Sequence, residues 1–379
     1  MAIDVALRIP PRPEMVLGAG ALEDLAELVG RLGTNSAFVV TDRGLVAAGV
    51  AGKVVGHLES AGVRTGIFDG VGPNPCARDV LAGSAALRSF GDAAVVAVGG
   101  GSAMDAAKAV ALHAVNDRPL EELDHRTRGL TPAAPLIGVP TTAGTGAETN
   151  AFGVIDDPIA RRKRYIGDSS ALPRFALLDP NLSVTAPPRV TAACGIDVLA
   201  HAMESVQARE CNVYSAALGL EAIRLVVTHL PAVVVDGRDV AGRSAMLLAA
   251  HLAGLAFATT GLGTAHAIGH ALSARYGTAH GIALAAVLPL VVGFNARERV
   301  AETVRIAEAA GVTGGAGGVQ QAVSALQEGM GLRPNLRELG VLHSELPAIA
   351  DAALVDEVVR NAPRVPTRIE LVRMLDAAY

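Results

Sequence analysis

Short, continuous apolar runs alternate with helix-like segments in the first half of the chain. The runs read SAFVVT, AAVVAV, LIGV and FALL, and they occupy residues 36–41, 93–98, 136–139 and 175–178. Between the first two runs, the stretch 45–61 has helical periodicity. Unbroken apolar strands separated by helices are typical of a parallel sheet that is buried on both faces. The first half therefore predicts an α/β domain built on a parallel sheet.

The second half of the chain has an almost entirely helical pattern. The boundary is expected at Pro187 and Pro188, which divides the chain into an α/β domain, 1–187, and an all-helical domain, 188–379. The glycine-rich segment GVTGGAGG at 311–318 predicts a loop between two helices. The helices predicted most clearly are 212–233, 240–259, 281–295 and 300–310.

Composition narrows the class of protein. Hydrophobic residues make up 51% of the 379 residues and charged residues 18%, as in a packed globular chain, and a net charge of -5 provides no basic surface for nucleic acid. The three cysteines lack zinc-site spacing and are too few for a disulfide framework. The first residues lack the apolar core of a signal peptide, and Gly, His or charge interrupts the apolar stretches. We therefore expect a cytoplasmic protein without membrane or nucleic-acid partners.

The segment VAVGGGSAMDAAKAVAL joins an apolar strand to a helix through three glycines. Glycines allow a phosphate to approach the backbone, and the helix N-terminus offers free N–H groups. Met104 stands where the usual dinucleotide fingerprint requires Gly or Ala, and no Gly-Lys-Ser/Thr follows. Taken alone, the loop is equally typical of a phosphate site and of a tight turn before a helix capped by Ser102.

Two further polar features follow predicted strands. The loop VPTTAGTGAETN, at 139–150, carries four threonines that suit ligand binding at the carboxyl edge of a sheet, or simply a solvated turn. Asp42 ends the strand SAFVVTD. An acidic residue there accepts hydrogen bonds from a ribose and repels a 2′-phosphate, which favours NAD over NADP. The alternative for Asp42 is an ordinary N-cap of the next helix.

Histidines and one aspartate form a candidate metal site. Asp197 and His201 are four residues apart, so on a helix they share a face. His266 and His270 form a second pair with this spacing, and His280 precedes a glycine. Imidazole and carboxylate ligands suit Fe(II), Zn(II), Co(II), Ni(II) or Mn(II). Spacing alone leaves open which histidines bind the metal and which one carries a proton instead.

The motifs together resemble a known family. In chain order they read VVTDRGL, FDGVGPNP, VGGGSAMDAAKA, VPTTAGTGAET, ARRKRYI, LLDPNL, GIDVLAHAMES and GLGTAHAIGHALSARYGTAHGIALAAVLP, and they extend from about residue 36 to 295. The chain resembles the iron-containing (group III) alcohol dehydrogenases of the dehydroquinate synthase-like superfamily. The resemblance implies a Rossmann-like α/β domain followed by a helical domain. It also implies hydride transfer between NAD(H) and a small alcohol or carbonyl substrate.

The resemblance assigns roles to individual residues. It implies one divalent metal, Fe(II) in the first place and Zn(II) as the alternative, held by Asp197, His201, His266 and His280. His270 matches a position that is usually not a ligand, so it is expected to relay a proton or to orient a ligand. The cofactor contacts implied are Asp42, Asn74, Gly99, Gly100, Gly101, Ser102, Asp105, Thr141, Thr142, Thr145 and Lys163.

Some positions depart from the family pattern. Cys76 replaces the Thr of the PNPT turn, Asn150 varies within its loop, and Phe152 stands where some members carry a polar residue. These changes leave the identity of the small alcohol or aldehyde open. The family is commonly dimeric or larger, so a homodimer or higher homo-oligomer is expected.

Three other functions compete with this interpretation. A maleylacetate reductase, which commonly works without metal, has no need of the complete ligand set. A sugar-phosphate cyclase of the dehydroquinate synthase type needs several basic residues near the ligands, and no such cluster is present in the sequence there. A binding module without catalysis has no physical need of both the ligand set and the glycine loop.

Overall fold

The computed structural model describes residue 7, residues 9–157 and residues 162–379. These residues form two compact units. The α/β unit comprises Pro11–Thr142 and Gly146–Ala186. The helical unit comprises Pro187–Tyr379, Ala143–Thr145 and the described residues ahead of Pro11. Part of the threonine-rich loop is therefore grouped with the helical unit.

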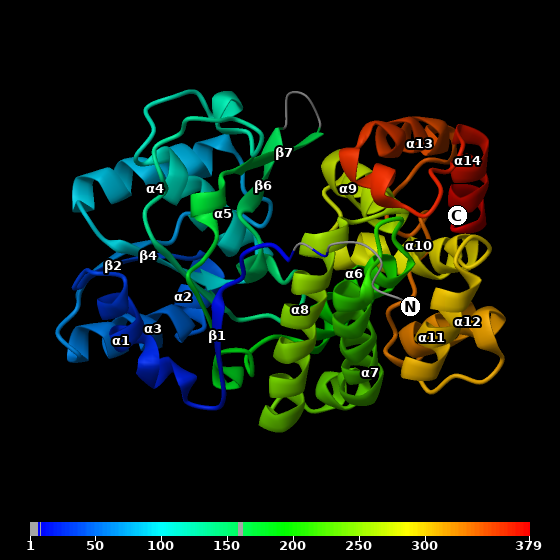
Figure 1. Cartoon of the computed structure of the whole chain (residues 1–379), viewed down its shortest axis with the longest axis horizontal. Helices are drawn as coiled ribbons and strands as arrows, with labels where there is room; N and C mark the ends of the chain where they lie inside the picture. Colours follow the sequence, from blue (N-terminus) through cyan, green and yellow to red (C-terminus); the bar gives the residue numbers. More distant parts are fainter. Residues whose placement is uncertain (1–6, 8, 158–161) are drawn as a thin grey trace. The chain divides into compact units, whose positions relative to one another are not determined.

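A six-stranded parallel sheet forms the centre of the α/β unit (Figure 1). The predicted parallel sheet is thereby confirmed, and the four apolar runs form β2, β4, β5 and β8. The two edge strands were not predicted, because their half-exposed sequences EMVL and RTGIF contain no buried apolar run. In spatial order the strands are β1 (Glu14–Leu17), β8 (Phe175–Leu178), β5 (Leu136–Pro140), β4 (Ala94–Gly99), β2 (Ser36–Val40) and β3 (Arg64–Phe68).

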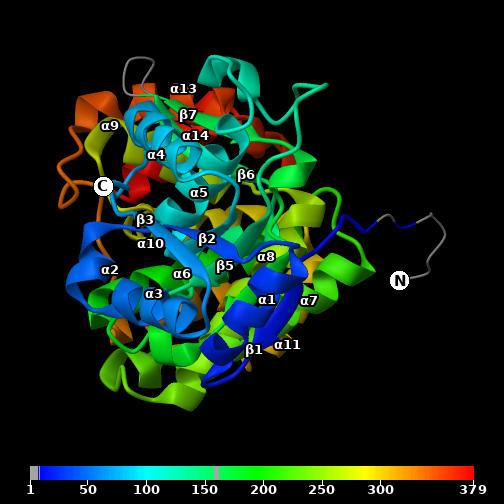
Figure 2. The same ribbon diagram turned by 90° about the vertical axis from the view of Figure 1, so that its left-hand side faces the viewer.

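Helices cover both faces of this sheet, as Figures 1 and 2 show. On one face, α4 (Ala77–Phe90) and α5 (Gly101–His113) pack against alternate strand residues such as Phe38 and Val40. On the opposite face, α1 (Leu25–Arg31) and α3 (Val50–Ser60) pack against the residues between them, such as Val39. The strands are continuously apolar because successive side chains enter two different cores.

Two parts of the α/β unit differ from the sequence prediction. The stretch 45–61 forms two helices, α2 (Arg43–Ala47) and α3, because Gly49 adopts a φ of 75° between them. An antiparallel hairpin of β6 (Phe152–Asp157) and β7 (Arg162–Gly167) follows the threonine-rich loop. Charged residues are frequent in both strands of the hairpin, so no apolar run marked it.

The helical unit consists of nine α-helices and short 3₁₀ turns in its described residues. The predicted loop at 311–318 is wrong in its second half, because α12 begins at Gly315 and continues through the remaining glycines. The nine helices are α6 (Pro188–Gln207), α7 (Val213–Val235), α8 (Val240–Thr260), α9 (Thr264–Tyr276), α10 (His280–Asn295), α11 (Val300–Ala309), α12 (Gly315–Gly329), α13 (Leu346–Val355) and α14 (Arg368–Ala377). Among the described residues, the 3₁₀ turns of the helical unit are η6 (His343–Glu345) and η7 (Glu357–Asn361), and those of the α/β unit are η1 (Ala21–Asp24), η2 (Leu120–Leu123), η3 (Ala147–Thr149), η4 (Ser169–Ala171) and η5 (Pro180–Leu182).

Among the described residues, α7 and α8 are long and apolar enough to cross a membrane by length and composition alone. The sequence interpretation had counted neither as a membrane span, because charged residues, His or Gly interrupt both. Core helices of soluble proteins can have the same length and apolar composition as membrane helices. Here α7 and α8 pack against each other and against α6, and 39% of the apolar window of α7 and 61% of that of α8 are buried.

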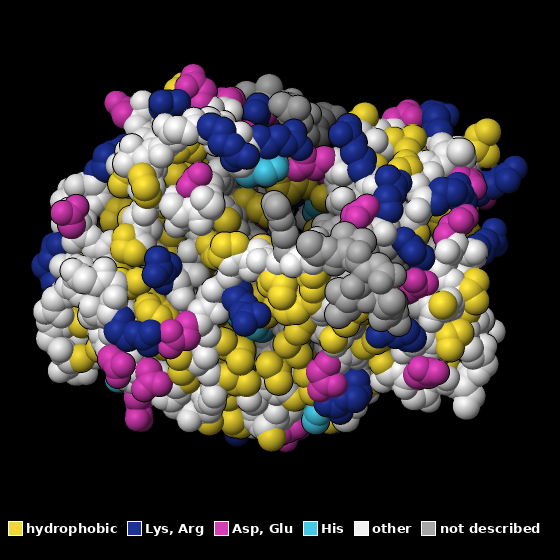
Figure 3. Space-filling view, viewed as in Figure 1, with side chains coloured by type: hydrophobic (Ala, Val, Ile, Leu, Met, Phe, Trp, Pro, Cys, Tyr) yellow, Lys and Arg dark blue, Asp and Glu magenta, His cyan; other side chains and the backbone are white. Residues whose placement is uncertain are grey.

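Surface charge is mixed on the face shown in Figure 3. Basic and acidic side chains are interspersed there among polar and apolar ones. The described residues of that face show no broad basic field of the kind that binds a nucleic-acid backbone.

Candidate functional site

Helix α6 carries Asp197, His201 and Glu204 on one buried face, with i, i+4 and i+7 spacing. His266 comes from the first turn of α9, and His280 is the first residue of α10. Packing of α6, α9 and α10 brings these side chains together within the helical unit.

One oxygen of Asp197 is the centre of the cluster. Its Oδ1 lies 3.6 Å from Nε2 of His201, 3.6 Å from Nε2 of His266 and 3.7 Å from Nε2 of His280. The ligand atoms of Asp197, His201 and His266 all lie within 4.8 Å of one another. Ligand atoms of a tetrahedral site with bonds of about 2.1 Å are about 3.4 Å apart, so the observed spacing suits a divalent metal.

Unsatisfied polar atoms support the same interpretation. Oδ1 of Asp197 and Nε2 of His266 are buried, and neither has a hydrogen-bond partner in the described part of the chain. Leaving such groups unpaired in an apolar interior is costly. A metal ion would satisfy both atoms, because the carboxylate oxygen and the deprotonated Nε2 each offer it a lone pair.

Glu204 fixes the orientation of His266, and the sequence analysis missed it. Its Oε2 accepts a 2.6 Å hydrogen bond from Nδ1 of His266, which leaves the lone pair on Nε2. A signal was present in the sequence, because Glu204 follows His201 by three residues and therefore lies on the same helix face.

Burial and the interactions between carboxylates and imidazoles shift the pKa values of the residues in this cluster. Burial would lower the pKa of His266, but the carboxylates of Asp197 and Glu204 on either side raise it to about 9. Burial lowers the pKa of His201 to about 4, with Asp197 acting in the opposite direction. Burial would raise the pKa of Asp197, but the surrounding imidazoles hold it well below its usual range. Both carboxylates are therefore ionised at neutral pH, since the pKa of Glu204 is also lowered, by His266 against the effect of burial.

His270 lies beside the cluster with a different partner. Its ring stacks on His280 with centroids 5.4 Å apart, while its Nδ1 lies 2.8 Å from Oδ2 of Asp356. The compact group of potential ligand atoms contains Asp197, His201 and His266, and both His270 and the predicted ligand His280 are outside it. Asp356 is 86 residues later in the chain, and no sequence spacing pointed to it.

The glycine loop of the α/β unit lies between β4 and α5. Gly99 has a φ of 152°, and a Cβ there would lie 2.5 Å from Cβ of Ala103. A Cβ on Gly100 would lie 2.9 Å from Oγ1 of Thr142, so the loop and the threonine-rich segment are in contact. Helix α5 begins at Gly101, with its N-terminal N–H groups at the carboxyl edge of the sheet.

The sheet edge also gathers residues of the PNP turn and the β6–β7 hairpin. The sequence analysis offered Ser102 as the cap of α5, and the structure corrects this. Gly100 is the N-cap, and the Ser102 hydroxyl donates to the carbonyl of Pro73 at 2.5 Å. The next residue, Asn74, accepts a long hydrogen bond of 3.5 Å from Nζ of Lys163. Lys163 also forms an ion pair of 2.5 Å with Asp156, which the sequence analysis did not single out.

Asp42 and Thr141 flank the glycine loop. Oδ1 of Asp42 accepts a hydrogen bond from the N–H of Leu45, so Asp42 is the N-cap of α2. Its Oδ2 is close to the glycine loop, because a Cβ placed on Gly99 would lie 3.8 Å from it. The N–H of the buried Thr141 donates to the carbonyl of Gly99. The last predicted threonine, Thr145, belongs to the short segment grouped with the helical unit.

Asp105 is engaged in a buried ion pair. Its Oδ1 lies 3.3 Å from Nζ of Lys108, which also donates to the carbonyl of Ala147 and to Oδ1 of Asn150. Burial raises the pKa of Asp105 and lowers that of Lys108, and the attraction between them opposes both shifts. Lys108, missed in the sequence, thus ties α5 to the end of the threonine-rich loop.

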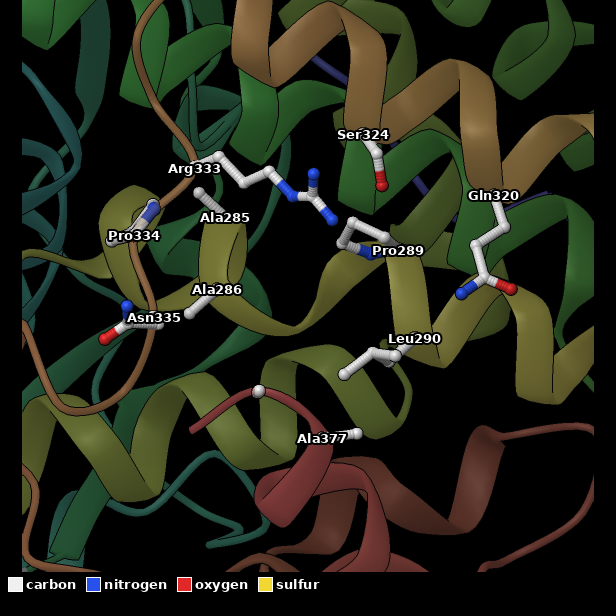
Figure 4. Close-up of a pocket in the computed structure, with 11 residues that line it drawn as sticks. Ala285, Ala286, Pro289, Leu290, Gln320, Ser324, Arg333, Pro334, Asn335 and Ala377 are labelled. Atoms are coloured by element: carbon white, nitrogen blue, oxygen red, sulfur yellow. The ribbon is translucent and has the colours of Figure 1, made fainter.

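A cavity of about 390 Å³ in the helical unit contains none of the predicted site residues. Figure 4 shows it between α10, α12 and the loop of Arg333, with Gln320 and Ser324 on its wall. Arg333 is already paired with Glu328. The cavity is therefore separate from the residues of the candidate site.

Comparison with known proteins identifies the family. The family model for iron-containing alcohol dehydrogenase matches residues 11–180, and the model for the C-terminal region of the Fe-containing alcohol dehydrogenase family matches residues 191–379. The chain belongs to the iron-containing alcohol dehydrogenases.

Its relatives within this family act on small alcohols and aldehydes. Lactaldehyde reductase of Escherichia coli strain K12 is 35% identical, with 96% of this chain and 97% of that protein covered. NAD-dependent methanol dehydrogenase of Bacillus methanolicus is 31% identical, with 97% and 98% covered. A crystal structure of 1,3-propanediol oxidoreductase superposes with a TM-score of 0.95 at 32% identity, with 99% of this chain and 100% of that chain covered.

These comparisons confirm three predictions. The family resemblance is correct, and so is the dehydroquinate synthase-like fold with a parallel-sheet nucleotide domain and a helical domain. The protein is an NAD-dependent oxidoreductase of the alcohol dehydrogenase class.

Proposed function

We propose that this iron-containing alcohol dehydrogenase interconverts a short-chain alcohol and its aldehyde, using one divalent metal and NAD(H). Asp197, His201, His266 and His280 hold the metal. The observation that carries this proposal is the pair of buried, unpartnered atoms, Oδ1 of Asp197 and Nε2 of His266, which lie 3.6 Å apart. The family supports Fe(II) as the ion, and the donor set is also compatible with Zn(II).

The protein side of the chemistry follows from the cluster. When bound, the metal supplies a Lewis acid that polarises an alcohol or carbonyl oxygen. Asp197 brings a negative charge to the three imidazoles, and Glu204 holds His266 with Nε2 directed at Asp197. Asp356 holds His270 through Nδ1, so Nε2 of His270 is left to take up or release the proton of the substrate hydroxyl.

The α/β unit binds the cofactor in this proposal. The pyrophosphate lies on the glycine loop at the N-terminus of α5, where backbone N–H groups and the helix dipole favour negative charge. Asp42 accepts hydrogen bonds from the ribose, which favours NAD over NADP. The remaining contacts proposed are Asn74, Gly99, Gly100, Gly101, Ser102, Asp105, Thr141, Thr142, Thr145 and Lys163.

The relatives guide the proposed substrate, and the family and the cysteines guide the proposed oligomeric state and compartment. Lactaldehyde, methanol and 1,3-propanediol, named for the relatives, are all short and polar. We therefore propose a short-chain alcohol or aldehyde as substrate and a homodimer or larger homo-oligomer as the working form. Three free cysteines favour a reducing, cytoplasmic compartment.

Metal analysis and kinetics on one sample test the proposal. NADH-dependent reduction of lactaldehyde is measured before and after chelation, with Fe(II) or Zn(II) added back. Activity should disappear on chelation and return with one ion. His266→Ala should lose metal and turnover together, whereas the control His343→Ala, an exposed histidine paired with Asp376, should keep both. Full activity in protein shown to be free of metal would overturn the proposal.

A further inference from the structure

We propose that Glu204 is the positioning residue of the metal centre: it anchors the start of α9 to α6 and holds His266 in the tautomer that can bind metal. This inference rests on the proposed metal site. It concerns a residue outside the four ligands, so it can fail while the ligand set stands.

Glu204 replaces the missing cap of α9. The N-cap residue of this helix, Gly263, has no side chain. Oε2 of Glu204 accepts a 2.9 Å hydrogen bond from the N–H of Gly263, and Oε1 accepts a 2.6 Å bond from the N–H of Ala265. A carboxylate at a helix N-terminus is stabilised by both the free N–H groups and the dipole. The first turn of α9, which contains His266, is therefore held by a side chain of α6.

The same carboxylate determines which nitrogen of His266 carries hydrogen. An ionised carboxylate only accepts, so Nδ1 of His266 must be the donor in their 2.6 Å contact. The neutral ring then has its lone pair on Nε2, the nitrogen that faces Asp197. A histidine ligand held in this way is pre-organised for metal.

The space around Glu204 is fitted to this arrangement. A Cβ added to Gly263 would lie 2.8 Å from Oε1 and 3.1 Å from Cδ of Glu204. Because no larger residue fits at 263 without displacing the carboxylate, Gly263→Ala should disturb His266 without removing any hydrogen-bonding group. Glu204 itself is almost completely buried, so the carboxylate cannot turn to solvent.

Glu204→Gln separates shape from chemistry. The amide has the size of the carboxylate, but one of its two polar atoms is a donor. If the amide nitrogen faces His266, the ring must accept at Nδ1 and carry its hydrogen on Nε2, which blocks the ligand atom. If it faces Ala265 instead, two donors oppose each other at the start of α9. The first arrangement should weaken metal binding by about 10- to 100-fold, as for a lost partner of this kind, and the second should weaken it by loosening the first turn of α9, which carries His266.

The matched control is Asp179→Asn in the α/β unit. Asp179 is also a buried carboxylate, and it accepts backbone N–H groups of Gly20, Leu22 and Asn181. No histidine is among these partners. Its amide variant should lose stability and retain the affinity for metal.

The experiment titrates metal-free wild type, Glu204→Gln and Asp179→Asn with Zn(II) against a chromophoric chelator. We expect a dissociation constant raised about 10- to 100-fold for Glu204→Gln and unchanged for Asp179→Asn. Histidine ¹⁵N chemical shifts of the metal-free proteins, recorded at a pH high enough for a neutral His266 ring, should show loss of the Nδ1–H tautomer of His266 only in Glu204→Gln. Wild-type affinity in Glu204→Gln would overturn the inference.

The outcome for the inference is separable from that for the proposed function. A wild type that binds no Zn(II) would overturn the proposed metal site. A wild type whose site is lost in His266→Ala but intact in Glu204→Gln would overturn only the role of Glu204. If Glu204→Gln does not fold, Gly263→Ala is titrated instead, and an unchanged dissociation constant there would equally refute the role.

Discussion

Nδ1 of His270 lies 2.8 Å from Oδ2 of Asp356, which is the N-cap of the 3₁₀ turn η7. The other oxygen of Asp356, Oδ1, accepts a hydrogen bond from the N–H of Val358, so both oxygens of the carboxylate have a partner. His270 is therefore oriented by a residue far along the chain, whereas His266, four positions earlier, is oriented by Glu204. Two neighbouring histidines of one helix thus have separate carboxylate partners, which suits one for metal binding and the other for proton transfer.

The first prediction concerns this pair. Asp356→Asn should lower kcat by at least about tenfold. General acid–base catalysis typically raises a rate by about 10²- to 10⁴-fold, and His270 should lose much of this effect when Asp356 no longer orients its ring. Metal content should stay at the wild-type level, since the hydrogen-bond partners described for Asp356, His270 and Val358, are not proposed ligands. Steady-state kinetics with metal analysis on the same samples check both statements. The control is Asp351→Asn, an exposed carboxylate that pairs with Arg368. An unchanged kcat in Asp356→Asn would argue against proton relay by His270.

The second prediction concerns the glycine loop. Gly100→Ala places a Cβ 2.9 Å from Oγ1 of Thr142, so the loop or the threonine must move by several tenths of an ångström. We expect a KM for NAD raised about tenfold with the fold intact, because preorganised backbone donors lose alignment with the phosphate. Gly56→Ala is the control, since a Cβ there meets open space on α3 and should stabilise the helix by about 0.5–1 kcal/mol. Equal KM values for the two variants would contradict a phosphate role for the loop.

Much of the fold could be predicted from the sequence, for physical reasons visible in the structure. β2 and β4 were recognisable because strands covered on both faces are almost continuously apolar. β1 and β3 escaped detection because an edge strand is only partly covered, so its residues need not be apolar. Gly49 broke the predicted helix 45–61 through its left-handed backbone, which a periodicity argument does not detect.

The candidate site was predictable only where its residues share one helix. Asp197 and His201 were visible as an i, i+4 pair, and Glu204 fits the same face, although a glutamate in a helix has many ordinary explanations. His266 and His270 satisfy the same spacing, so spacing could not choose between them. The distinction lies in their partners, Glu204 and Asp356, which tertiary packing supplies.

The third prediction concerns pH and stability at the start of α14. Hydrogen bonds from Arg364, and then from Thr367, lower the pKa of Glu370 to about 2 from an ordinary value of 4.5. A carboxylate with a lowered pKa stabilises the fold above its unfolded-state pKa, and this contribution is lost as the pH falls from about 4.5 towards 2. Glu370→Gln should cost up to about 1 kcal/mol at pH 7, because the partly exposed ion pair with Arg364 is lost, while a glutamine can still complete the capping box with Thr367.

Urea unfolding of the wild type and Glu370→Gln from pH 7 to pH 3 checks this prediction. The difference between the two free energies of unfolding should shrink as the pH falls. The exposed Glu59 provides the control Glu59→Gln, which should show no such difference. A difference for Glu370→Gln that stays constant over this range would exclude the ion pair as its cause.

The fourth prediction links metal to the stability of the helical unit. A ligand that binds only the folded state stabilises it by about 4 kcal/mol when its concentration is 1,000 times the dissociation constant. Chelation should therefore lower the urea midpoint of the wild type markedly. Asp197→Ala should unfold at the same midpoint with and without chelator, because its oxygen is the common neighbour of three imidazole Nε2 atoms. An equal chelator effect in the wild type and Asp197→Ala would mean that the stabilising metal binds somewhere other than this cluster.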